Sequence, residues 1–215
     1  MYAIEALNIR KSFRDQTVLD DVSLQVEKGK IYGLVGDNGS GKSVLLKCLC
    51  GILPCDNGEI RIAGKSMKTG KGKPPILGIV IEHPGFLDSM SGWHNLKYLA
   101  GIRGIISDDQ IKKALECVGL IGHEKKKVKK YSLGMRQRLA IAQAIMEDPD
   151  VYIMDEPFNG LDKHAVADMR ALFSSMREKG KTFLLVSHYA ADIENLCDQV
   201  YEISGGKMNK KEETL

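Results

Sequence analysis

The chain has 215 residues, of which 43% are hydrophobic and 27% are charged. This length suits one domain with at most a small subdomain, and the composition supplies a packed core and does not indicate disorder. The formal net charge of +3 is too small to argue for a nucleic-acid partner, and we expect none. The apolar runs are far shorter than the roughly 18 residues that a transmembrane helix requires, and no signal peptide opens the chain. We therefore expect a cytoplasmic protein unless something holds it at a membrane.

Closely spaced strands are predicted at the start of the chain. Ala3–Phe13 has the pattern of one strand, and Val18–Leu19 and Val22–Val26 have the pattern of two short ones. Because no helix separates them, we expect an antiparallel sheet. Phe13 lies near the end of the first strand, where its ring can stack on an adenine or can equally be an ordinary core or surface side chain.

A glycine-rich loop follows the apolar run Ile31–Val35 and precedes the helical pattern Val44–Cys50. It fits G-x-x-x-x-G-K-[ST] at every required position and consists of Gly36, Asp37, Asn38, Gly39, Ser40, Gly41, Lys42 and Ser43. The backbone N–H groups of such a loop and the N-terminus of its helix suit a phosphate, Lys42 can reach the β- and γ-phosphates, and the Ser43 hydroxyl can ligate Mg²⁺. The alternative is a glycine-rich turn that binds nothing, which the motifs below make less plausible.

The middle of the chain adds one acidic candidate and a helical region. A buried strand predicted at 76–81 delivers Glu82 at its tip, where a carboxylate either lies in the ligand crevice of an α/β sheet or caps a loop. The segment 64–75 before it is predicted to be a loop, and residues 91–121 have a helical pattern. The basic stretch 124–130 is short and has no interleaved aromatic residues, so a solvated loop is favoured over a lipid or nucleic-acid patch.

Two further strand tips carry polar groups in the last third of the chain. A strand at Val151–Met154 ends in Asp155 and Glu156, where the Asp can hold Mg²⁺ and the Glu can polarise an attacking water. A strand at 182–186 ends in Ser187 and His188. An isolated histidine would usually be structural, but a third polar group at a third strand tip favours a shared site.

The ordered set of motifs resembles the ATP-binding subunit of ABC transporters over nearly the whole chain. The set comprises the phosphate loop, a Ser-x-Gly helix start at Ser132, the Asp-Glu strand, Asn159-Gly160-Leu161-Asp162 and Ser187-His188. The resemblance implies an α/β fold with a P-loop NTPase core, a mainly parallel sheet, an N-terminal antiparallel β subdomain and a helical subdomain at roughly 86–146. All of these would form a single ATP-binding domain over residues 1–215.

The resemblance also implies a role for each matching residue. Phe13 would stack on adenine, Lys42 and the glycine loop would hold the phosphates of ATP, and Ser43, Glu82 and Asp155 would lie at Mg²⁺. Glu156 would be the catalytic base and His188 the switch residue at the γ-phosphate. Ser132 and Gly134 would touch the ATP of a second subunit, which is another copy of this chain or a related ATPase subunit. Such subunits hydrolyse ATP as head-to-tail dimers that drive a separate membrane permease from its cytoplasmic side.

Two departures from the common family pattern point to a branch. Glutamate stands at position 82 where glutamine is usual, and the signature reads Tyr-Ser-Leu-Gly-Met rather than Leu-Ser-Gly-Gly-Gln. Both features look similar to the branch that expels antimicrobial peptides, including bacitracin-resistance and lantibiotic-immunity pumps. Glu82 adds a negative charge beside Asp155 and Glu156 that demands a cation, and our hypothesis is that Mg²⁺ supplies it.

Other functions within the same family are less consistent with the sequence. DNA-repair members carry a long coiled coil between the phosphate loop and the signature, and ribosome-associated members carry two cassettes, and this chain has neither. A soluble ATPase for cofactor assembly stays open as the alternative. A non-hydrolysing regulator is disfavoured because Lys42, Ser43, Asp155, Glu156 and His188 are all present.

Overall fold

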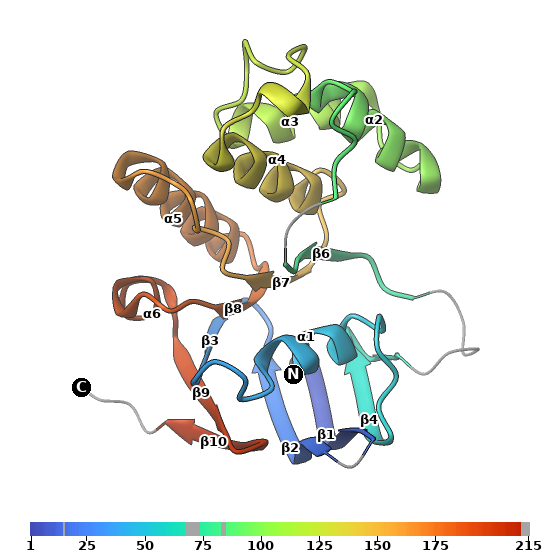
Figure 1. Cartoon of the computed structure of the whole chain (residues 1–215), viewed down its shortest axis with the longest axis vertical. Coiled ribbons are helices and arrows are strands. Elements are labelled where there is room, and N and C mark those ends of the chain that lie inside the picture. Colours follow the sequence, from blue (N-terminus) through green and yellow to red (C-terminus); the bar gives the residue numbers. More distant parts are fainter. Residues whose placement is uncertain (15, 68–73, 83–84, 212–215) are drawn as a thin grey trace.

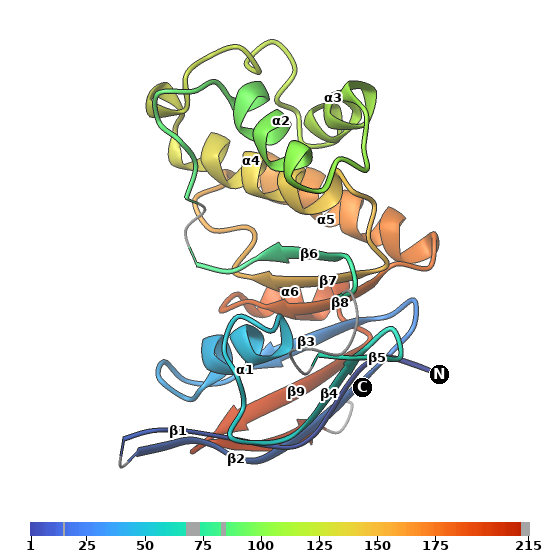
Figure 2. The same cartoon turned by 90° about the vertical axis from the view of Figure 1, so that its right-hand side faces the viewer.

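Two β-sheets with a helix between them form the lower part of the molecule, and a group of helices forms the upper end (Figures 1 and 2). The computed structural model of the chain describes residues 1–14, 16–67, 74–82 and 85–211. The predicted loop at 64–75 is described only in part, because 68–73 lie outside these residues.

The smaller sheet is antiparallel throughout and has the order β2-β1-β4-β5. Its strands are β1 (Tyr2–Phe13), β2 (Gln16–Glu27), β4 (Asn57–Ile62) and β5 (Lys65–Ser66). The prediction of two short strands within β2 was wrong, because the strand continues through Asp20 and Asp21. Register shifts around Ile9 accommodate these polar residues, and the Asn8 amide donates a hydrogen bond of 2.8 Å to the Asp21 carboxylate.

The larger sheet carries the ends of the predicted site strands. Its order is β10-β9-β3-β8-β7-β6, and every pairing is parallel except that of the edge strand β10. Its strands are β3 (Ile31–Val35), β6 (Leu77–Val80), β7 (Val151–Asp155), β8 (Thr182–Val186), β9 (Gln199–Ser204) and β10 (Lys207–Lys211). Because β3, β7 and β8 are parallel neighbours, their carboxyl ends meet at one edge, as crevice sites of α/β sheets require.

Helices cover both faces of the larger sheet. Helix α1 (Lys42–Leu49) lies between the two sheets, and its buried leucines share one hydrophobic core with β1, β2, β3 and β8. Helices α5 (Lys163–Glu178) and α6 (Ala190–Leu196) lie on the opposite face (Figure 1). There Phe173 stacks on Phe183, which stacks on Tyr152, with ring centroids 4.9 and 4.6 Å apart. These aromatic contacts fix α5 against β7 and β8.

A group of short and medium-length helices forms the upper end of the molecule. It contains α2 (Gly92–Arg103), α3 (Asp108–Cys117), the 3₁₀ turn η1 (Val128–Lys130) and α4 (Leu133–Ile145). The apolar pattern of residues 136–146 predicts a helix that starts at Arg136, but α4 begins at Leu133. The Ser132 hydroxyl caps the helix there by accepting a hydrogen bond from the Met135 N–H at 3.2 Å.

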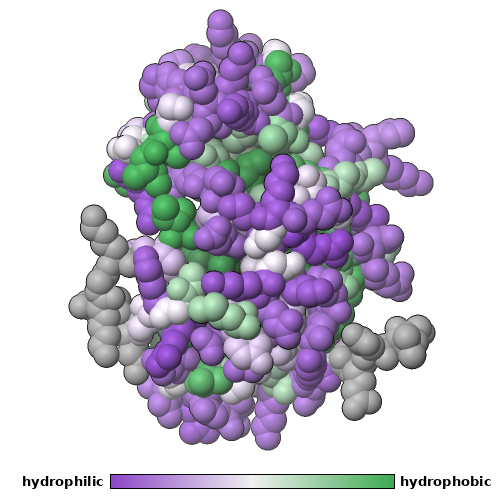
Figure 3. Space-filling model, turned by 180° about the vertical axis from the view of Figure 1, so that it is seen from behind, coloured by the Kyte–Doolittle hydropathy of each residue, from purple (hydrophilic) through white to green (hydrophobic). Residues whose placement is uncertain are grey.

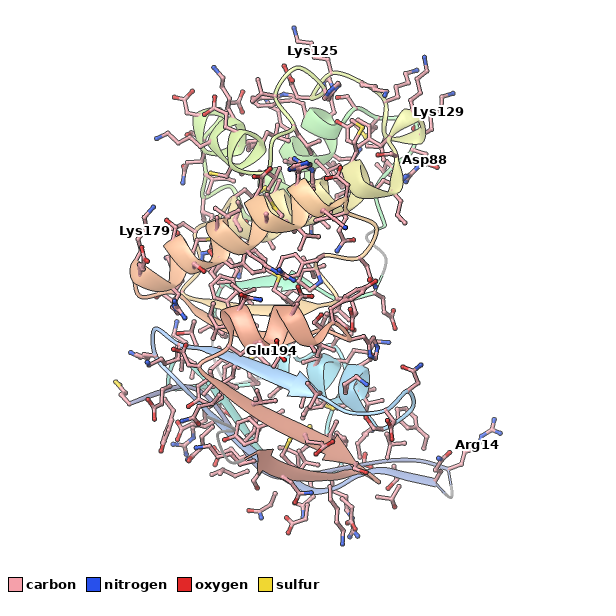
Figure 4. All side chains as sticks on the ribbon, turned by 90° about the vertical axis from the view of Figure 1, so that its left-hand side faces the viewer. Arg14, Asp88, Lys125, Lys129, Lys179 and Glu194 are labelled. Carbon is pink, nitrogen blue, oxygen red and sulfur yellow. The ribbon has the colours of Figure 1, made fainter. Side chains whose placement is uncertain are left out.

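The basic stretch 124–130 lies at the far tip of this helical end. Its lysines are exposed, and Lys125 and Lys129 point away from the body of the molecule (Figure 4). This position agrees with the predicted solvated loop. In the part of the chain that the structure describes, no helix combines the length and apolarity needed to cross a bilayer.

Candidate active site

A cavity of about 580 Å³ opens at the carboxyl edge of the larger sheet. It brings together residues of the glycine loop, the tip of β6, the tip of β7 and the segment after β8. Its lining comprises Val18, Asn38, Gly39, Gly41, Lys42, Ser43, Val44, Glu82, Leu133, Gln137, Asp155, Glu156, Asn159, Gly160 and His188. Most of the predicted site residues therefore share one space.

The glycine loop is closed on itself by Lys42. The buried Lys42 ammonium donates to the carbonyl oxygens of Gly36 at 2.6 Å and Asp37 at 2.8 Å. Gly36 has a φ of 148°, and a Cβ there would lie 2.2 Å from the Ile203 carbonyl, so the turn requires glycine. The Ser40 hydroxyl oxygen is buried and has no hydrogen-bond partner among the described residues. A buried unpaired hydroxyl in the same loop as Lys42, just before the N-terminus of α1, fits a phosphate.

Ser43 and Asp155 form the second part of the site. The Ser43 hydroxyl donates to Asp155 Oδ2 across 3.3 Å, which joins the start of α1 to the tip of β7. Burial raises the pKa of Asp155, and the neighbouring Glu82 adds to the rise while Ser43 and Lys42 oppose it. A hydroxyl and a carboxylate in contact fit Mg²⁺, which takes one or two protein oxygens and completes its shell with water and phosphate.

Glu156 and His188 face each other beside this pair. His188 Nε2 lies 3.4 Å from Glu156 Oε1, and that oxygen is buried without a hydrogen bond among the described residues. Burial, and then the charge of Asp155, raise the pKa of Glu156 to about 7. Glu156 has a φ of 49°, which few residues with a Cβ adopt, and its N–H donates to the Val186 carbonyl at 3.0 Å. A carboxyl with such a pKa at a strained position has the properties of a general base.

Glu82 has a cationic partner that the sequence reasoning did not identify. Lys47 Nζ lies 2.5 Å from Glu82 Oε1. A lysine of α1 therefore pairs with Glu82, and the hypothesis of a Mg²⁺ counter-ion did not include this partner. The missed signal is spacing, because Lys47 follows Ser43 by four positions and so lies on the same face of the helix.

Six predicted residues are absent from this lining. Gly36, Asp37 and Ser40 lie in the glycine loop but do not line the cavity, and Phe13, Ser132 and Gly134 lie on other parts of the chain. Phe13 is 45% exposed at the end of β1, with the Lys11 ammonium 5.5 Å from its ring centroid, and Val18 is the β2 residue at the cavity wall. Ser132 is exposed, and Gly134 packs against the loop at Gly160, where a Cβ on Gly134 would lie 2.9 Å from the Gly160 carbonyl.

The family model described as ABC transporter matches residues 19–159. The chain belongs to the ABC transporter family. Among curated relatives, the uncharacterized ABC transporter ATP-binding protein YybJ of Bacillus subtilis is 40% identical over 99% of this chain and 97% of its own length. The bacitracin transport ATP-binding protein BcrA of Enterococcus faecalis is 40% identical over 93% of this chain, which spans 65% of that protein. The lantibiotic transport ATP-binding protein SrtF of Streptococcus pyogenes is 35% identical over 94% of this chain and 86% of its own length.

Solved structures show the same fold. The ATP-binding subunit of an ABC transporter superimposes with a TM-score of 0.88 at 27% identity, covering 97% of this chain and 89% of that one. A dimeric ATP-binding cassette bound to ADP and Pi superimposes with a TM-score of 0.87 at 20% identity, covering 98% and 99% of the two chains. The chain is thus an ABC ATPase with the predicted P-loop core, antiparallel subdomain and helical subdomain.

Two supports of this ABC ATPase site were missed by the sequence reasoning. Gln137, one turn into α4, donates to the carbonyls of Pro157 at 2.9 Å and Glu156 at 3.3 Å, so it ties the helical end to the tip of β7. Its only signal was a polar side chain on the otherwise apolar face of α4.

The second support holds the segment that carries His188. Asp192 is buried, accepts from the Ser187 hydroxyl at 2.5 Å and pairs with the Arg170 guanidinium of α5. The sequence gives no spacing signal for this network, because Arg170 and Asp192 lie on different helices.

Proposed function

We propose that this ABC ATPase binds Mg·ATP in the cavity described above, hydrolyses it in a head-to-tail dimer, and powers a separate membrane permease. One observation carries the proposal. Lys42, Ser43, Asp155, Glu156 and His188, which come from three separate segments, line a single cavity of about 580 Å³. That volume lies in the usual range for small-ligand sites.

The glycine loop would receive the phosphates. The ammonium of Lys42 now bonds two carbonyl oxygens of its own loop, and it can exchange these bonds for phosphate oxygens of ATP. Ser40 would gain the partner that it lacks in the described chain. Ser43 and Asp155 would hold Mg²⁺, which when bound neutralises charge on the phosphates.

Glu156 and His188 would act on the reacting water and the γ-phosphate. A Glu156 pKa of about 7 leaves a large fraction of the carboxylate ready to accept a proton at neutral pH. His188 Nε2 lies 3.4 Å from Glu156 Oε1, so the histidine can donate a hydrogen bond to a γ-phosphate next to this carboxylate. The Asp192–Ser187 bond holds the segment that orients His188.

The exposed Ser132 supports the proposal of a dimer, because it does not line the nucleotide cavity of its own chain. Ser132 is exposed at the start of α4 and lies outside its own chain's nucleotide cavity. The helix N-terminus that Ser132 caps is suited to an anion, and a γ-phosphate held by one phosphate loop needs donors from the other side.

A second cavity next to the nucleotide site supports the proposal of a permease partner. A groove of about 600 Å³ lies between Glu82, the tip of β6 and helix α2, and is lined largely by apolar residues that include Phe86, Leu87 and Leu99. Tyr98 in this groove is 60% exposed. Figure 3 shows hydrophobic side chains gathered between the helical end and the sheets on an otherwise mostly hydrophilic face. An apolar groove of this kind fits a helix of a partner protein.

The transported compound would be an amphipathic peptide or antibiotic that is exported. The relatives BcrA and SrtF are named for bacitracin and lantibiotic transport, and the chain shares 40% and 35% identity with them. The ATPase would then work at the cytoplasmic face of the cell membrane.

Two measurements test the proposal. Purified protein should hydrolyse ATP only with Mg²⁺, and Glu156→Gln should nearly abolish turnover while leaving an ATP-bound dimer that gel filtration detects. Affinity capture from detergent extracts should recover a polytopic membrane protein, and co-expression with it should raise the resistance of a sensitive host to bacitracin or a lantibiotic. Recovery of a soluble scaffold protein instead would contradict the transport role, while loss of ATP binding would contradict the ATPase itself.

A further inference from the structure

One ion pair ties Glu82 to the phosphate-loop helix. Lys47 and Ser43 lie one turn apart on the same face of α1, and each contacts an acidic residue that follows or ends a strand of the larger sheet. Ser43 contacts Asp155 at the end of β7, and Lys47 contacts Glu82 beyond β6. One face of α1 therefore contacts both carboxylates.

Glu82 stands between two cavities, and Lys47 belongs to one of them. Glu82 lines both the nucleotide cavity and the apolar groove, whereas Lys47 lines the groove. The ion pair therefore draws the carboxylate toward the groove side. Glu82 has a φ of 56°, a conformation that residues with a Cβ rarely adopt and that persists where neighbours support it.

We propose that Lys47 is a positioning residue that holds the Glu82 carboxylate on the groove side in the nucleotide-free protein and releases it toward Mg²⁺ when nucleotide binds. This inference rests on the proposed function. The physical reason is competition, because an ammonium and a divalent cation that contact the same carboxylate repel each other. Lys47 also neutralises a charge that otherwise repels Asp155, whose pKa Glu82 raises.

The ion pair between Lys47 and Glu82 connects the groove to the nucleotide cavity. Any group that binds in the groove and engages Lys47 would free Glu82, so occupation of the groove and affinity for Mg²⁺ become linked. Both side chains are partly exposed, 32% for Lys47 and 60% for Glu82. The Glu82 carboxylate can therefore leave Lys47 without unfolding. Because an exposed ion pair contributes little free energy, loss of the pair should change the affinity for Mg²⁺ by about two- to fivefold.

The test is a Mg²⁺ titration of the binding of a fluorescent, non-hydrolysable ATP analogue. The variants are Lys47→Met, Glu82→Gln, the double variant, and the charge-conserving Lys47→Arg. Lys97→Met is the matched control, because Lys97 pairs with Asp108 at 2.8 Å and lines neither cavity. Lys47→Met should lower the half-saturating Mg²⁺ concentration about two- to fivefold. It should have no further effect in the Glu82→Gln background, and Lys47→Arg and Lys97→Met should titrate like the wild type.

Other outcomes overturn the inference. An equal effect of Lys47→Met with and without Glu82 would mean a general electrostatic field, and no effect in either background would mean a neutral surface pair. Both results would leave the ATPase function intact, since the wild type still binds the analogue with Mg²⁺. If the wild type shows no Mg²⁺-dependent binding, the proposed function fails and this inference fails with it. Melting curves of the nucleotide-free variants verify that each is folded.

Discussion

The Glu156 carboxyl has a raised pKa in the folded protein, and this makes the free energy of unfolding depend on pH. The folded protein holds this carboxyl with a pKa of about 7, whereas its ordinary value is 4.5. Between these values the folded state binds more protons than the unfolded state, so the free energy of unfolding falls as pH rises. Above pH 7 the full cost of the buried charge is present.

Glu156→Gln should therefore stabilise the nucleotide-free protein in a pH-dependent manner. We expect a gain of about 2 kcal/mol in the free energy of unfolding at pH 8 and almost none at pH 4, measured by urea denaturation. Glu194→Gln on α6 is the control, because Glu194 is exposed and the same change there should be neutral at both pH values. A gain of equal size at pH 4 and pH 8 would show that burial of the charge is not the cause.

At the level of elements, the start of α4 packs against the loop that follows β7. Gly160 has a φ of 75°, and a Cβ on it would lie 2.6 Å from Leu133 Cγ and Cδ2. Leu133 stands in the signature where the common family pattern has glycine. The structure gives it a packing role over Gly160 and a place in the wall of the nucleotide cavity.

A pair of glycine variants separates this packing from backbone strain. Gly180 has a similar φ of 84°, and a Cβ there would meet no atom within 4 Å. Gly180→Ala should cost about 1 kcal/mol from its backbone alone, and Gly160→Ala should cost about 1 kcal/mol more because Leu133 must move. Thermal or urea unfolding measures both.

The second substitution Leu133→Ala decides the cause of that difference. It should bring the cost of Gly160→Ala close to that of Gly180→Ala, since the crowded side chain is then gone. If the two glycine variants cost the same at the outset, Leu133 does not pack on Gly160 in solution.

The elements themselves were largely predictable, and the exceptions have physical reasons. The strands that end at Asp155 and His188 are short apolar runs with clear limits, so the parallel sheet and its edge followed from the sequence. The continuity of β2 did not follow, because a bulge near Asn8 absorbs two aspartates that look like a break. The start of α4 was misplaced by three residues because Ser132 caps it.

The candidate site was predictable where a motif fixes the chemistry and not where support comes across the fold. The cavity is lined by part of the glycine loop and by Glu82, Asp155, Glu156 and His188, whose positions at strand tips could be read from the sequence. The partners of these residues (Lys47, Gln137 and Asp192) come from segments far apart in the chain or from a helix face whose contacts depend on tertiary packing. Helix spacing places Lys47 on the same face as Ser43, but no local pattern specifies which residue each of these side chains contacts.

At the scale of the whole molecule, the proposed reaction needs two copies of the chain. The phosphate loop and the signature residue Ser132 belong to the same chain, yet Ser132 lies outside the cavity that the loop lines. In a head-to-tail dimer each ATP would lie between the phosphate loop of one copy and the signature of the other. A variant that damages the loop and a variant that damages the signature should then complement each other.

Mixing Lys42→Met with Ser132→Asp tests this arrangement. Asp is as good a helix cap as Ser, so α4 should persist while a negative charge faces the γ-phosphate of the partner. Each variant alone should be nearly inactive, because both of its composite sites are damaged. In an equimolar mixture, random pairing makes half of the dimers mixed, and each mixed dimer has one site with a wild-type loop and a wild-type signature. ATPase activity should therefore recover to about a quarter of the wild-type rate, measured per chain by phosphate release. If the mixture stays at the level of the separate variants, while the wild type is active and all three proteins form dimers, the loop and the signature do not meet across the two chains.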